Sequence, residues 1–135
     1  MRVIITFLLL FALGPVSAQS GTRGTPVPVE EHFRLASGNT AVGFTPDGLR
    51  YFAYLDKSGE RRIRVLNRDG SVLQAAREPL AIQDGAYCIT WNFINGGRKE
   101  CGIKVIKDGD EFSYVNPDGS RRAPHKFEQG NSRGL

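Results

Sequence analysis

Short hydrophobic runs separated by polar turns cover most of this chain. In several runs apolar and polar side chains alternate one by one, as at residues 62–65, where two arginines alternate with Ile63 and Val65. An alternation of period two is typical of a β-strand that is buried on one face. The turns between the runs place Gly after Asp, Ser or Asn, which suits the positive φ angles of tight hairpins. They are Asp47-Gly48, Ser58-Gly59, Asp69-Gly70, Asp84-Gly85, Asn95-Gly96-Gly97, Asp108-Gly109 and Asp118-Gly119.

The spacing of these turns predicts an all-β fold, an antiparallel meander of about seven or eight strands. Pro79 cannot donate to a strand ladder, so residues 80–82 are predicted to form a separate short piece or an edge. A meander of this size typically closes into a small barrel or a strongly curled sheet, because closure removes exposed strand edges. The strands are expected at residues 39–44, 49–55, 61–67, 71–76, 86–94, 99–107, 111–116 and 121–127.

The N-terminal residues have the pattern of a signal peptide. Arg2 precedes an apolar run at residues 3–13, which is too short to span a bilayer. Gly14-Pro15 breaks this run and small residues follow, which predicts cleavage after Ala18; an uncleaved membrane anchor is the alternative. We therefore expect a periplasmic or secreted protein without stable membrane insertion after cleavage.

The remaining chain is predicted to be a single β domain over residues 29–128. Residues 29–37 within it are predicted to form a short N-terminal helix, with Pro28 at its entry and Gly38 after its end. We expect Phe33 to dock this helix on the sheet and His32 to lie at the surface. The flanking segments are predicted to be a flexible leader at residues 19–28 and a frayed C-terminus at residues 129–135.

Export gives the two cysteines a structural interpretation, because oxidising compartments favour disulfides. Cys88 and Cys101 flank a predicted turn on consecutive strands, and we predict a disulfide between them rather than two separate thiols. Strict alternation would place their sulfurs on opposite faces of the hairpin. A bulge near Gly102 would shift the alternation and allow the bond to form.

The chain carries a mild net charge of +4 at pH 7. Clusters of arginine can attract nucleic acid or anionic headgroups, but a solvated outer strand face explains them equally without a ligand. We favour the solvated face and expect no nucleic-acid partner for an exported protein. The candidate basic patch comprises Arg61, Arg62, Arg64, Arg121 and Arg122.

Patterns of catalytic or metal-binding residues are weak in this sequence. His32 and His125 lie near opposite ends of the mature chain, and we expect both at the surface, outside any nucleophilic site. Asp108 and Asp110 share one exposed turn, unlike the separated carboxylates of a glycosidase. The acidic loops lack EF-hand spacing, and two thiols with two distant histidines do not predict a zinc site. The sequence therefore predicts a non-enzymatic protein without a metal or cofactor.

Aromatic residues on the predicted strands are candidate binding residues. Small barrels either fill their interior with such side chains or hold one apolar ligand at the mouth. A filled interior is the expectation for a chain of this size. The alternative is a ligand pocket that includes Tyr87, Trp91 and Tyr114.

One combination of motifs over residues 35–119 resembles a family of small exported bacterial proteins of unknown function. The resemblance implies a β-sheet domain outside the cytoplasm, and it implies no catalytic residue because the family has no established activity. The residues that carry it are Leu35, Gly38-Asn39-Thr40, Tyr51, Tyr54, Cys88, Trp91, Cys101, Asp108-Gly109 and Tyr114.

These observations favour an exported, non-enzymatic β domain that binds a protein or a small ligand in the periplasm. One alternative is an inhibitor of a cell-wall hydrolase, since small disulfide-bearing barrels of similar size inhibit lysozymes. The positive net charge argues against it, because lysozymes are commonly basic and would not be steered towards this chain. A carrier of a small apolar ligand is the second alternative.

Overall fold

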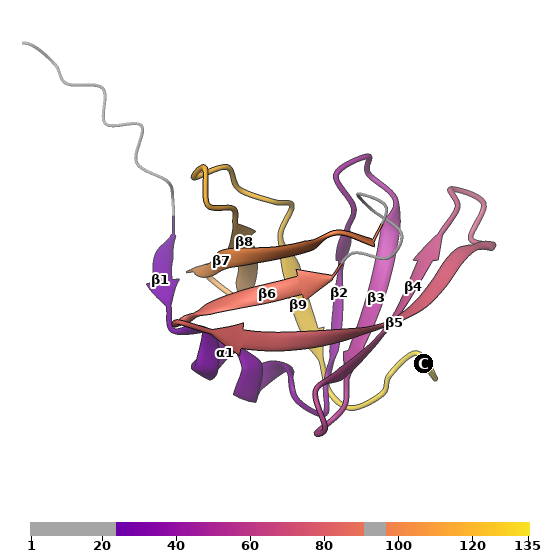
Figure 1. Ribbon diagram of the computed structural model, residues 1–135. Helices are drawn as coiled ribbons and strands as arrows, with labels where there is room; N and C mark the ends of the chain where they lie inside the picture. Colours follow the sequence, from indigo (N-terminus) through magenta and orange to yellow (C-terminus); the bar gives the residue numbers. More distant parts are fainter. Residues whose placement is uncertain (1–23, 91–96) are drawn as a thin grey trace, which may run out of the picture.

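The computed structural model describes residues 24–90 and 97–135 (Figure 1). These two ranges contain one α-helix and nine β-strands. The predicted signal peptide and Trp91 lie outside the described residues. The helix is α1, Val29–Ala36, and the strands are β1 Thr25–Val27, β2 Thr40–Phe44, β3 Arg50–Leu55, β4 Glu60–Leu66, β5 Val72–Gln83, β6 Ala86–Thr90, β7 Lys99–Asp108, β8 Glu111–Val115 and β9 His125–Glu128.

Eight of the described strands, β2 to β9, form a closed antiparallel barrel. Strands β2 to β8 pair in sequence order, and β9 closes the barrel between β8 and β2 (Figure 1). The predicted all-β meander and its closure into a barrel are therefore confirmed. The β8–β9 seam is short, since its ladder pairs only Phe112 with His125 in the described residues, whereas residues 40–43 of β2 all pair with β9.

Strand β5 is continuous through Pro79, so the predicted break after residue 76 is wrong. Pro79 is the last β5 residue that pairs with β4, and Leu80 is the first that pairs with β6. The proline therefore stands where the strand changes neighbours, and its missing N–H interrupts neither ladder.

The predicted alternation on β4 is confirmed, with Ile63 and Val65 buried and Arg62 and Arg64 on the outer face. Arg61 follows the same period and also points into the barrel, where it is buried. The interior is otherwise largely apolar and aromatic. Its main cluster comprises Val29, Ala36, Leu55, Leu80, Tyr87, Ile89, Ile103, Val105, Phe112 and Tyr114.

Helix α1 lies at the end of the barrel that carries the β3–β4 and β5–β6 turns (Figure 1). Its buried side chains are Val29, His32 and Ala36, while Phe33 packs only partly buried against the core. His32 therefore docks the helix together with Val29 and Ala36, and its predicted surface position is wrong, while the expected contact of Phe33 with the core is present but only partly buried. The spacing of three to four residues places these three side chains on one helical face, which closes this end of the barrel.

The predicted leader and frayed C-terminus are both partly structured. Thr25–Val27 of the leader forms β1, which pairs with residues 105–107 of β7, beyond the part of β7 that pairs with the first residues of β6. At the other terminus the Thr40 hydroxyl donates to the Gly130 carbonyl at 2.7 Å and accepts from the Ser132 N–H at 3.2 Å. Both segments therefore extend the ordered domain.

The two cysteines form the predicted disulfide, Cys88–Cys101. Tyr87 pairs with Ile103 and Ile89 pairs with Glu100, so two residues of β7 lie opposite Cys88. Gly102, with φ of 78°, is the extra residue of this bulge. The predicted bulge is confirmed, and it brings both sulfurs to one side of the hairpin.

Candidate functional site

The barrel interior contains a cavity of about 50 Å³ that reaches the end opposite α1. Its walls include Ala53, Ile63 and Leu80, and its rim includes Phe44 and Pro46 from the end of β2 and the loop after it. A cavity of this size holds about three or four waters, or one small chemical group, but not a whole drug-sized molecule. The polar groups that border it are Thr45, Tyr51, Arg61, Tyr114 and Arg122.

Arg61 and Glu78 form a buried ion pair beside this cavity. They lie directly opposite each other on β4 and β5, and an Arg61 guanidinium nitrogen donates to the Glu78 carboxylate at 2.8 Å. The side chains are only 6% and 0% exposed, and Arg61 also hydrogen-bonds Tyr114. Removing either partner would leave a buried charge, so the pair holds a specific arrangement of the interior.

Arg122 brings a second positive charge to the cavity from the β8–β9 loop. Its Nε donates to the Asn116 side-chain oxygen at 2.8 Å, and a terminal nitrogen donates to the Glu100 carboxylate at 2.6 Å. These two contacts hold the guanidinium at the mouth of the barrel. A shallow groove of about 880 Å³ continues outward from there, and Pro46, Arg122 and Ala123 border both spaces.

Tyr51 and Tyr114 contribute hydroxyls to the same cavity. Burial raises the pKa of both phenols, and the neighbouring Arg61 and Arg122 guanidinium charges only partly oppose that effect. The hydroxyls therefore stay protonated at neutral pH and can donate hydrogen bonds.

A second polar cluster lies between α1 and the barrel wall. The Tyr87 hydroxyl donates to the Val29 carbonyl at 3.0 Å, so its oxygen accepts from His32 Nδ1–H at 2.9 Å. Neutral His32 then has a bare Nε2, which accepts from His125 Nε2–H at 3.0 Å. His125 Nδ1 is left as a buried acceptor without a hydrogen-bond partner among the described residues.

Both histidines are buried, 1% and 2% exposed, so the predicted surface position of His125 is also wrong. Burial lowers the pKa of His32 to about 4 and that of His125 to about 3, where the charges of His32 and Arg61 add to the effect. The cluster is therefore neutral at physiological pH. It attaches the helix to the barrel and does not border the cavity.

The two predicted pocket residues that the structure describes lie in different places. Tyr114 borders the cavity, Tyr87 is fully buried in the histidine cluster, and Trp91 lies outside the described residues. The interior residues that sequence reasoning missed are Tyr51, Arg61 and Glu78. For Arg61 a signal existed, since it lies two residues before Ile63 in an alternating strand.

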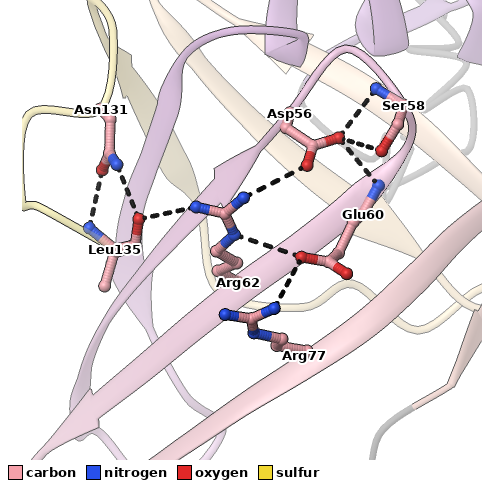
Figure 2. A network of polar contacts seen from close by, with 7 residues as sticks. All are labelled: Asp56, Ser58, Glu60, Arg62, Arg77, Asn131 and Leu135. Carbon is pink, nitrogen blue, oxygen red and sulfur yellow. Dashed lines mark hydrogen bonds and ion pairs between the residues drawn. The ribbon is translucent and has the colours of Figure 1, made fainter.

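The arginines of the predicted basic patch do not form one surface. Arg61 is inside the barrel, and Arg121 and Arg122 border the groove at its mouth. Figure 2 shows Arg62 on the outer face, where it contacts the Asp56 and Glu60 carboxylates and the Leu135 carbonyl oxygen. Arg64 lies on the same outer face and donates to the Arg133 carbonyl at 3.4 Å.

No protein-family model matches this chain, and neither a curated protein nor a solved structure is significantly similar to it. The family resemblance therefore stays a prediction. The Cys88–Cys101 disulfide indicates an oxidising compartment. Within the described ranges, no helix has the length and apolar character needed to cross a bilayer. In the same residues no group of three His, Cys, Asp or Glu side chains is placed to hold a metal ion.

Proposed function

We propose that this protein is an exported, non-enzymatic binding protein that receives a small ligand, or one end of a longer ligand, in the open end of its barrel. The observation that carries the proposal is the interior cavity that extends from Ala36 of α1 to the opposite end of the barrel, and whose apolar walls surround a few polar groups. Binding sites for small molecules typically combine these two features. The predicted signal peptide and the disulfide support a periplasmic or secreted location.

The non-enzymatic part of the proposal rests on the position of the titratable groups. His32 and His125 bond to each other and to Tyr87, away from the cavity. Arg61 is paired with Glu78, and the Tyr51 phenol stays protonated. These groups suit recognition of a ligand better than proton transfer to it.

A methyl-resolved NMR titration with hexanol and hexanoate tests this proposal. We expect both probes to shift the methyl resonances of Leu55, Ile63 and Leu80, which border the cavity. Shifts confined to the exposed side chains of Leu35 and Val72 would contradict it, because those residues lie on the outer surface.

Matched substitutions locate the site. Ala53→Leu places a larger side chain in the cavity, and Ala41→Val fills a smaller part of it. Both should abolish or weaken binding, whereas Ala75→Leu, at an exposed position of β5, should leave it unchanged. Unfolding curves for each variant separate loss of binding from loss of the fold, and unchanged binding in folded Ala53→Leu would overturn the proposal.

A further inference from the structure

The polar groups around the cavity are predominantly hydrogen-bond donors. Arg61 and Arg122 are obligatory donors with positive charge, and the Tyr51 and Tyr114 hydroxyls remain protonated. None of the described residues that border the cavity is acidic. A ligand group that enters this space therefore meets donors and positive charge inside an apolar wall.

Two carboxylates form ion pairs with these arginines but do not border the cavity. Glu78 pairs with Arg61 at 2.8 Å, and Glu100 pairs with Arg122 at 2.6 Å. The carboxylates offset the net charge of the pairs, but only the arginines border the cavity, so its walls present the positive ends of two ion pairs. These ends favour one negative charge, whereas the double charge of phosphate would add more uncompensated charge to the buried space.

From this arrangement we propose that the ligand of the barrel is a small amphipathic carboxylic acid, bound as its anion. The carboxylate accepts hydrogen bonds from Tyr51 and Tyr114 beside the two guanidinium groups. The carboxylate and the carbons next to it occupy the cavity beside Ala53 and Ile63. The rest of the apolar chain extends past Phe44 and Pro46 at the rim. This inference rests on the proposed binding function and names the ligand class of the same site.

The physical reason is the cost of burying polar groups without partners. A carboxylate that leaves water needs several strong donors, and charge-assisted hydrogen bonds are the strongest that a protein offers. An alcohol of the same length fits the apolar walls equally well but accepts weaker hydrogen bonds. The cavity should therefore select the acid over the alcohol by about tenfold or more.

Isothermal titration calorimetry with hexanoate and hexanol, both at neutral pH, measures this selectivity. In the wild-type protein we expect hexanoate to bind at least about tenfold more tightly than hexanol. Tyr51→Phe and Tyr114→Phe should each weaken hexanoate binding by about fivefold or more and leave hexanol binding nearly unchanged. Tyr54→Phe is the matched control, because Tyr54 is on the outer side of the same strand, β3.

The outcomes separate the ligand class from the binding function. Equal affinities for hexanoate and hexanol would overturn the carboxylate inference and leave the proposed function standing. Inorganic phosphate that competes with hexanoate for the cavity would also overturn it, since the site would then accept any oxyanion. If neither hexanoate nor hexanol binds at millimolar concentration, both proposals fail together.

Discussion

At the scale of single residues, hydrogen bonds hold two groups of buried polar side chains together. His32, Tyr87 and His125 form one chain of hydrogen bonds that ends on the Val29 carbonyl, and Arg61 and Glu78 form another unit. A buried polar atom without a partner costs about 1–3 kcal/mol, which explains why these residues lie together. His125 Nδ1 is the exception in the histidine chain and makes this cluster sensitive to protonation.

The pH dependence of stability should reveal the two buried histidines. Their folded-state pKa values, about 4 and about 3, lie below the ordinary value of 6.5, so the unfolded chain binds more protons in between. The free energy of unfolding should therefore fall as the pH decreases from about 6.5 to about 4, by up to about 1.4 kcal/mol per pH unit for each histidine. Urea unfolding across this range measures the slope.

His32→Gln is the control for this prediction, because glutamine retains polar atoms but does not titrate. The slope should be roughly halved in this variant. Surface carboxylates such as Asp56 and Asp118 have lowered pKa values as well, and they lose their contribution only at more acidic pH. A wild-type stability that stays constant down to about pH 4 would contradict the assignment of neutral, buried histidines.

At the scale of elements, the β6–β7 hairpin depends on one irregular residue. The bulge at Gly102 reverses the alternation of β7 and brings Cys101 to Cys88. The alternation in the sequence alone places the two sulfurs on opposite faces of the hairpin. The glycine next to Cys101 indicates the position of the bulge that brings them to one face. Strand β5 is a case in which the sequence pattern misleads. Pro79 predicts a break in the strand, and only the pairing with β4 on one side and β6 on the other shows that the strand continues.

Substitution of Gly102 by alanine should destabilise the protein more than the same change at Gly48. Both glycines have positive φ, 78° and 82°, which costs an L-residue about 1–2 kcal/mol. At Gly102 a Cβ atom would also lie 3.2 Å from Pro117 Cγ, whereas nothing lies within 4 Å at Gly48. Thermal unfolding of both variants measures the difference, and equal losses would show that Pro117 moves aside without cost.

At the scale of the whole molecule, the barrel is closed by a short seam and reinforced by its C-terminal segment. Strand β9 meets β8 at a single ladder pair among the described residues, Phe112 with His125. Gly130 and Ser132 then bond to the start of β2, and the Arg133 guanidinium lies 4.5 Å from the Phe52 ring centroid. These contacts hold β9 in place after it has paired with β2.

Thr40→Val tests this reinforcement, because valine retains the shape of threonine without its hydroxyl. The hydroxyl makes two hydrogen bonds to the C-terminal segment, at 2.7 and 3.2 Å, in a fully buried position. We expect the free energy of unfolding to fall by about 1–3 kcal/mol and the Ser132 amide to exchange faster with solvent. Thr25→Val, at an exposed position of β1, should change neither quantity.

The sequence by itself determined most of the strands, the turns, the short helix, the antiparallel meander and the disulfide with its bulge, but it missed β1 and divided β5. These features depend on interactions between near neighbours, namely the period of two along a strand, the φ angles of Asp-Gly turns and the spacing across one hairpin. A local pattern is readable without knowledge of the rest of the chain.

Only the tertiary structure decided which polar residues share the interior. His32 and His125 are 93 positions apart, so their contact exists only after the helix docks and the barrel closes. Arg61 and Glu78 meet within the β4–β5 pair, and the rest of the fold then buries them. The cavity likewise depends on side chains from most of the strands at once. The alternation on β4 indicates that Arg61 points inward. A buried charge is stable only beside its counter-charge, and the carboxylate that fills this role, Glu78, comes from the neighbouring strand β5.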